Sequence, residues 1–140
     1  MPPKIVAAKI VSTNLADGDF IQLVASRFGI VSEDTSKGNL VKEIEQFLIN
    51  CHESGQRALL VVDEAQNCTY AQLKMLLTRL GWNSTMVVTG DPAQTDLLPE
   101  LSGLAVISDK LEEVDNIGVV RLQSEDIVRH PLVASMLTVL

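Results

Sequence analysis

The sequence ALLVVDEAQN at residues 58–67 decides the fold that this chain is expected to adopt. Its first five residues are all apolar, which is typical of a strand that helices cover on both faces. The run stops at Asp63 and Glu64, and in open parallel sheets ligands bind beyond the carboxyl ends of the strands. We therefore expect a buried strand at 58–62 that delivers an acidic pair to a ligand site.

Alternating strand and helix patterns surround this stretch. Asp19 with Gln22, and Thr69 with Gln72, resemble helix-capping pairs. The predicted strands are 7–12, 58–62, 85–89 and a further core strand at 117–122. The predicted helices are 20–28, 40–51, 69–80, 101–111 and 131–140. Such alternation predicts an α/β fold with a three-layer parallel sheet, helices lying on both of its faces.

Composition narrows the function classes. The chain has 140 residues, is 46% hydrophobic and carries a formal net charge of −7, so its surface as a whole does not favour nucleic acid. No apolar run approaches the roughly 20 residues that span a bilayer, and no signal-peptide pattern follows Met1, so no membrane insertion and a cytoplasmic location are expected. Cys51 and Cys68 lack metal-ligand spacing and are expected to be buried free thiols.

An apolar strand followed by Asp-Glu is the pattern that places a metal-handling carboxylate and a water-activating one beside a nucleotide phosphate. In this interpretation Asp63 holds Mg²⁺ through water and Glu64 orients or deprotonates the attacking water. The alternative, a solvated acidic pair that ends a strand, is about as probable for Asp-Glu alone. Gln66 and Asn67 favour the functional interpretation.

The next predicted strand leads into TGDPAQ at residues 89–94. Gly90 permits a tight turn, and the amide of Gln94 offers both a donor and an acceptor that could sense a phosphate or the attacking water. The alternative is a turn with a surface amide. Two polar motifs at the ends of neighbouring strands make the site interpretation more attractive.

Residues 60–133 resemble the carboxyl half of PhoH-type ATPases. The resemblance is carried by an ordered series: VVDEAQN (61–67), TY (69–70), QLKM (72–75), LTRLG (77–81), VVTGD (87–91), Gln94, DL (96–97), SGL (102–104) and DIVRHPLV (126–133). A series of this length and order is highly specific.

This resemblance implies a P-loop NTPase-like fold similar in its core to superfamily-one helicases, with ATP and Mg²⁺ as ligands and RNA as a further partner. Asp63 and Glu64 would take the Walker B roles, Gln94 the place of a phosphate sensor, and Gln66, Thr89 and Asp91 would belong to the same nucleotide site.

Two arginines are further candidates for contacting phosphate, in this or a neighbouring subunit, since a guanidinium neutralises charge on a transferred phosphoryl group. Arg129 is the stronger candidate and Arg79 the weaker. The alternatives are an ion pair of Arg129 with Asp126, and for Arg79 a helix-terminal charge that the helix dipole favours.

The phosphate cradle of the P-loop is missing from the pattern. No Gly-x-x-x-x-Gly-Lys-Ser/Thr occurs, and Lys37-Gly38 has the reverse order. Residues 8–11, 47–49 and 59–67 loosely resemble ExeA-type secretion ATPases, in which a Walker A loop precedes such a segment. We interpret 1–140 as a single partial domain without the Walker A strand, loop and helix. It consists of an ExeA-like segment at 1–57 and a PhoH-like segment at 58–140, produced by a join or a truncation.

Three hypotheses follow. The first is a PhoH-like protein that binds and hydrolyses ATP, active only if a partner or a longer native chain supplies the missing phosphate loop, with a homo-oligomer as a further possible assembly. The second is a non-catalytic recombined or remnant domain that binds protein or RNA. The third, a plain flavodoxin-like fold without nucleotide chemistry, requires the PhoH resemblance to be accidental. ATPase ancestry is the stronger expectation and catalysis by these 140 residues the weaker.

Overall fold

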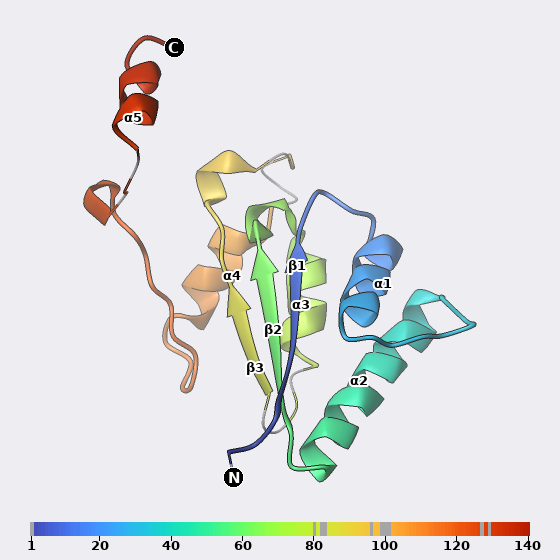
Figure 1. Cartoon of the computed structure of the whole chain (residues 1–140). Coiled ribbons are helices and arrows are strands. Elements are labelled where there is room, and N and C mark those ends of the chain that lie inside the picture. The colour runs from blue at the N-terminus through green and yellow to red at the C-terminus, as the bar shows by residue number, and fades with distance from the viewer. Residues whose placement is uncertain are drawn as a thin grey trace. The chain divides into compact units, whose positions relative to one another are not determined.

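The chain forms two compact units. The computed structural model describes residues 2–79, 81, 84–95, 97–98, 102–126, 128 and 130–140 (Figure 1). The first unit spans Met1–Lys110 and the second unit spans Leu111–Leu140. The prediction of one domain over 1–140 thus covers two units. Their division falls near residue 110, whereas the join inferred near residue 57 stays a prediction.

A three-stranded parallel sheet forms the centre of the first unit. It contains β1 (Ile5–Val11), β2 (Arg57–Asp63) and β3 (Ser84–Val88) in the order β1-β2-β3. The register pairs Ile10 with Val62 and Val62 with Val88, so the three strands end almost level. Figure 1 shows the three arrows pointing the same way. The predicted α/β class with a parallel sheet is confirmed.

Helices provide the crossovers that parallel strands require. The connection from β1 to β2 contains α1 (Asp17–Arg27) and α2 (Lys37–Glu53), and that from β2 to β3 contains α3 (Tyr70–Leu77). Apolar side chains from all three helices meet those of β2 and β3 in a common core. Its buried members include Phe20, Ile21, Val24, Leu40, Ile44, Leu60, Val62, Leu73 and Leu76.

The opposite face of the sheet is open among the described residues of the first unit. Successive strand residues alternate in direction. On β1, Ala8 and Ile10 are buried, whereas Ile5 and Val11, which belong to the alternate set, are 61% and 42% exposed. Val87 on β3 is 42% exposed as well. The sheet and one helical layer of the predicted three are therefore present within these residues. The continuous apolar run of β2 had suggested that helices cover both of its faces equally. Within the described residues they do not.

The two predicted capping pairs have different outcomes. The α3 capping box is confirmed, because the Thr69 hydroxyl accepts the Gln72 N–H at 3.1 Å and the Gln72 amide oxygen accepts the Thr69 N–H at 3.0 Å. The predicted capping pair of Asp19 with Gln22 is wrong. Helix α1 begins at Asp17 with Ala16 as its N-cap, so Asp19 lies inside the first turn, where its negative charge suits the helix dipole.

Two helices lie in the carboxyl-terminal part of the chain. They are α4 (Leu104–Leu111) and α5 (Pro131–Leu137), and both are shorter than predicted. The predicted core strand at 117–122 is wrong: these residues form no regular element, and Val120 and Leu122 are 83% and 78% exposed. A strand needs a hydrogen-bonded neighbour, and no described residue of the second unit provides one.

Candidate functional site

The carboxyl edge of the sheet is organised around Asp63, the last residue of β2. Its Oδ1 accepts hydrogen bonds from the Thr89 hydroxyl at 2.8 Å and from the Glu64 backbone N–H at 2.9 Å. The Lys9 ammonium on β1 lies 3.8 Å from Oδ2. One carboxylate thus connects the ends of all three strands.

These contacts decide the ionisation of Asp63. The hydrogen bond from the Thr89 hydroxyl, and then that from the Glu64 N–H, lower the pKa of the Asp63 carboxyl below its ordinary value of 3.8. Desolvation opposes them with the third-largest effect, and the nearby Lys9 contributes a still smaller lowering. Donors that bind the charged form favour that form. Asp63 is therefore an ionised carboxylate at neutral pH, which is the form that a metal ion binds.

Glu64 has a backbone conformation that side chains rarely adopt. Its φ is 54° and its ψ is 40°, in the left-handed region, which costs a residue with a Cβ on the order of 1–2 kcal/mol. The flanking chain enforces it, because the Ala65 N–H donates to the Thr89 carbonyl at 2.9 Å and the Asn67 N–H to the Glu64 carbonyl at 3.1 Å. The Glu64 side chain remains exposed. Such local strain is characteristic of functional sites.

Gln66 connects the loop after β3 to the end of β2 through hydrogen bonds. It lies in the 3₁₀ turn η1 (Ala65–Asn67) and is buried, and its Oε1 accepts the Asp91 N–H at 3.1 Å. Its carbonyl accepts the Thr95 hydroxyl at 2.7 Å. A Cβ on Gly90 would lie 2.6 Å from that same Oε1, so only glycine permits this approach. The Gln66 amide oxygen is therefore committed to holding the loop.

Gln94 lies at the same edge of the sheet as Glu64. It ends the 3₁₀ turn η2 (Pro92–Gln94), which contacts η1. The Asp91 carboxylate accepts the Ala93 N–H at 3.0 Å through Oδ1 and the Gln94 side-chain amide at 2.8 Å through Oδ2. The structure thus brings Asp63, Glu64, Thr89, Asp91 and Gln94 together at one edge. Their roles at a nucleotide remain predictions.

The segment that follows β1 completes this edge, which the sequence did not reveal. The Ser12 N–H donates to the Asp63 carbonyl at 3.0 Å, and the Asn67 side chain donates to the Ser12 carbonyl at 3.4 Å. A serine after a short strand carries no pattern that would predict this. Parallel pairing of β1 with β2 is what places it there.

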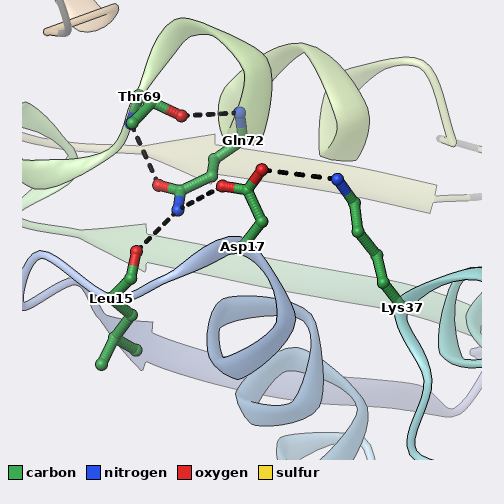
Figure 2. Close-up of polar contacts among 5 residues, drawn as sticks. All are labelled: Leu15, Asp17, Lys37, Thr69 and Gln72. Atoms are coloured by element: carbon green, nitrogen blue, oxygen red, sulfur yellow. Dashed lines mark hydrogen bonds and ion pairs between the residues drawn. The ribbon is translucent and has the colours of Figure 1, made fainter.

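The buried Gln72 forms hydrogen bonds with the residues that lead from β1 into α1, as Figure 2 shows. Besides capping α3, the Gln72 amide donates to the Leu15 carbonyl at 2.8 Å and to Asp17 Oδ1 at 3.0 Å, while Lys37 Nζ lies 3.4 Å from Asp17 Oδ2. The sequence predicted the cap but not these long-range bonds. Gln72 thus connects the starts of α1 and α3 just behind the carboxyl edge.

Neither arginine candidate joins this group among the described residues. Helix α3 runs from the end of β2 back toward the start of β3, so Arg79 lies at the opposite edge of the sheet, where its Nε is 3.2 Å from Glu45 Oε1. A contact from Arg79 to a phosphate beside Asp63 of the same chain is therefore not supported. Arg129 lies outside the described residues. The Asp126 carboxylate, its alternative partner, accepts the Gln123 N–H at 2.7 Å.

The oxygen groups at the edge fit Mg²⁺ only as part of a larger site. Among the described residues no three His, Cys, Asp or Glu side chains gather closely enough to hold a metal ion. Mg²⁺, however, is commonly bound through one or two carboxylates together with phosphate oxygens and water. Asp63, with the Thr89 hydroxyl beside it, is a donor set of that kind.

Both cysteines are free and buried, as predicted, and burial raises the pKa of each thiol. Uncharged buried thiols of this kind are poor nucleophiles and metal ligands. Within the described residues, no helix combines the length and apolar character needed to traverse a bilayer. These observations leave the carboxyl edge as the main chemical feature of the sheet.

Comparison with known proteins identifies the family. The family model described as "PhoH-like protein" matches residues 54–140. The chain is 51% identical over 81 residues to the PhoH-like protein of Bacillus subtilis (strain 168), covering 57% of this chain and 25% of that protein. It is 54% identical over 77 residues to the PhoH-like protein of Synechocystis sp., covering 54% and 24%, respectively.

A third relative, Protein PhoH of Escherichia coli (strain K12), is 44% identical over 91 residues, which cover 64% of this chain and 26% of that protein. The chain thus spans about a quarter of the length of these relatives. The resemblance of the first half to ExeA-type ATPases stays a prediction. Because the family model covers more than half of the sequence, this chain belongs to the PhoH-like family.

Proposed function

We propose that the carboxyl edge is the metal-handling and water-handling half of an ATP-hydrolysing site. A phosphate-binding loop would come from another polypeptide segment. The observation that carries the proposal is the pairing of Asp63 with Thr89 at the ends of two adjacent parallel strands, with Glu64 strained beside them. Membership in the PhoH-like family supports it.

Asp63 and Thr89 would form the metal-binding part. The carboxylate is ionised, and among the described residues the contact of its Oδ2 is with Lys9 at 3.8 Å, which leaves this oxygen able to accept a metal-bound water. When bound, Mg²⁺ would neutralise charge on the phosphates. The Thr89 hydroxyl fixes the rotamer of the carboxylate so that little reorganisation is needed on binding.

Glu64 would act as the general base. Its carboxylate is exposed, and its residue follows Asp63 immediately in a left-handed backbone conformation. A base in this position can accept the proton of a water molecule as that water attacks the terminal phosphorus. Gln94 would hold the same water or the leaving phosphate through its amide, after releasing its 2.8 Å bond to Asp91.

Phosphate release by the chain with ATP and Mg²⁺ tests this proposal. We expect slow turnover, because these residues contain no Walker A loop, and a decrease of about 100-fold or more in Glu64→Gln, since general bases contribute that much. Glu53→Gln at the end of α2 is the matched control and should leave turnover unchanged. Turnover that survives in Glu64→Gln would remove Glu64 from this role.

A further inference from the structure

A basic groove lies between α2 and α3, away from the carboxyl edge. It has a volume of about 650 Å³ and is open to solvent. Its described lining contains Lys37, Lys42, Lys74 and Arg79, against the single acid Glu45. The lining thus carries 4 − 1 = +3, whereas the chain as a whole carries −7. The groove therefore has a local positive potential that attracts acidic groups.

Two of the four cations have no carboxylate of the described chain to neutralise them. These are Lys42 on α2 and Lys74 on α3, and both side chains are exposed. The other two cations lie 3.4 Å and 3.2 Å from a carboxylate, and Figure 2 shows the first of these pairs, Lys37 with Asp17. Because the two uncompensated lysines come from opposite walls, a ligand with more than one carboxylate can meet both.

The floor between the charged walls is apolar. Val41 from α2 and Met75 from α3 line it and are half-buried, and Gly38 and Ala71 add no polar side chain. Val41 and Met75 also line a small cavity of about 20 Å³ that reaches the core between these helices and the sheet. The methylene stems of the lysines extend the apolar surface upward along the walls. An aliphatic side chain placed between α2 and α3 would therefore be removed from water.

The charge and the apolar floor together select a class of ligand. A nucleic acid matches the charge, but its backbone offers no aliphatic group for the floor, and the described lining contains no aromatic ring on which a base could stack. A peptide segment offers carboxylates and aliphatic side chains within a few residues. An apolar centre with a polar rim is the usual anatomy of a protein–protein interface.

We infer that the basic groove docks a short acidic segment of a partner protein, in which an aliphatic side chain stands between carboxylates. The aliphatic side chain lies against Val41 and Met75. The carboxylates meet Lys42 on one wall and Lys74 on the other. The inference does not rest on the proposed ATP site, because no residue of the carboxyl edge lines the groove.

A second copy of the chain is the weaker occupant. The chain has one acidic run of suitable composition, EEVD at residues 112–115. Glu112 of that run is already engaged, because its Oε2 lies 3.6 Å from the Arg121 guanidinium. A partner protein with a free acidic segment would bind without breaking such a pair.

Fluorescence anisotropy with a labelled synthetic peptide tests the inference. The probe has about a dozen residues, all glutamate except for two leucines about four positions apart, so that both leucines share a face in a helix. We expect a dissociation constant on the order of 100 µM at about 50 mM salt. A matched peptide with serine in place of both leucines should bind at least about 10-fold more weakly, because it leaves the apolar floor in water.

Two results of this titration would overturn the inference. Absence of binding of the leucine peptide to the wild-type chain at low salt would show that the groove does not dock such a segment. Equal affinity for the leucine and serine peptides would show that the groove responds to charge alone and that its apolar floor plays no part.

Variants locate the site on the protein. Lys42→Glu with Lys74→Glu should weaken binding of the leucine peptide at least about 10-fold, since two attractive contacts become repulsive. Lys42→Arg with Lys74→Arg should retain binding. Lys4→Glu with Arg27→Glu changes the net charge equally outside the groove and should retain affinity within about twofold. Circular dichroism verifies the fold of each variant, and an equal loss in the groove pair and in the control pair would contradict the inference.

Two further measurements distinguish the other occupants. Oligouridine of about a dozen nucleotides, titrated in the same assay, should bind more weakly than the leucine peptide at this site. Tighter binding of oligouridine that is lost in the Lys42 and Lys74 variants would assign the groove to nucleic acid instead. Sedimentation equilibrium of the chain should show no association through the groove. Association that Glu112→Lys with Glu113→Lys abolishes would assign the groove to a second copy and overturn the inference.

Discussion

The carboxyl edge and the basic groove between α2 and α3 are two polar surfaces of the same unit that are built in different ways. The cations that line the groove are Lys37, Lys42, Lys74 and Arg79. At the edge, Asp63, Thr89, Gln66 and Asp91 bind one another or the neighbouring backbone at 2.8–3.1 Å. In the groove, the longer side chains of Lys42 and Lys74 are exposed and bound to no described carboxylate. The edge is fixed by geometry, whereas the groove is defined by charge.

This difference matters for what each surface can do. Chemistry on a bound ligand requires groups held in place before it arrives, and every bond at the edge contributes to that. A positive electrostatic potential requires only that charges of one sign be close together. Substitutions at the edge should therefore change stability and local structure, whereas those in the groove should have little effect on the fold.

The largest expected effect concerns the buried glutamine behind the edge. Gln72→Ala leaves the Leu15 carbonyl and the Thr69 N–H without their partner, and we expect a loss of about 3 kcal/mol in the free energy of unfolding. Gln46→Ala on α2 removes an exposed bond to Asn50 and should cost less than about 0.5 kcal/mol. Urea denaturation measures both. Equal losses would show that the edge is no more rigidly built than the exposed helices.

Two glycines sharpen the comparison. A Cβ at Gly90 would lie 2.6 Å from Gln66 Oε1 and 3.0 Å from its backbone nitrogen, so Gly90→Ala should cost about 1–3 kcal/mol. Gly38 lines the groove with nothing within 4 Å of its Cβ position, and Gly38→Ala should be neutral or stabilise α2 by up to about 1 kcal/mol. Thermal denaturation tests the pair. A stabilising Gly90→Ala would contradict the close packing of the edge.

A smaller effect concerns the ionisation of Asp63. Thr89→Val removes the hydroxyl that contributes most to the lowered pKa, so the pKa of Asp63 should rise toward its ordinary value. Thr85→Val, at an exposed position of β3, is the matched control and should leave it unchanged. Carbon-13 NMR of the carboxyl group during an acid titration measures both.

The sign for stability follows from the direction of this shift. A carboxyl whose pKa is lower in the folded than in the unfolded chain stabilises the fold fully above the unfolded value. That contribution is lost as the pH falls through the lower folded value. Thr89→Val should therefore reduce the acid dependence of stability below about pH 4. An unchanged acid transition would show that the Thr89 hydroxyl does not hold the carboxylate.

The sequence was sufficient to predict the parallel sheet and the position of the acidic pair. Apolar runs at 58–62 and 85–89 fall on β2 and β3 within one residue at each end, because a run flanked by helical patterns has few other interpretations. The run at 117–122 looked similar and is no strand. Periodicity reports burial tendency, whereas a strand also requires a neighbour, and a single sequence does not reveal that neighbour.

The sequence predicted only those parts of the site that lie directly after strands. Asp63, Glu64 and Gln94 share one edge because they follow strands, and strand ends can be read from the sequence. Ser12, the long-range bonds of Gln72 and the groove lysines depend on which helices and strands pack together. Arg79 was assigned to phosphate by motif, but the length of α3 carries it to the opposite edge.

The most direct test of the proposed metal site is nuclear magnetic resonance of the amide groups in the presence of ATP and Mn²⁺. This paramagnetic ion binds to the same oxygen ligands as Mg²⁺ and broadens the signals of nearby residues. We predict selective broadening at Glu64, Ala65 and Thr89 that disappears in Asp63→Asn. Broadening that persists in Asp63→Asn, or that concentrates at the acidic residues Glu112 and Glu113 of the second unit, would contradict the proposal.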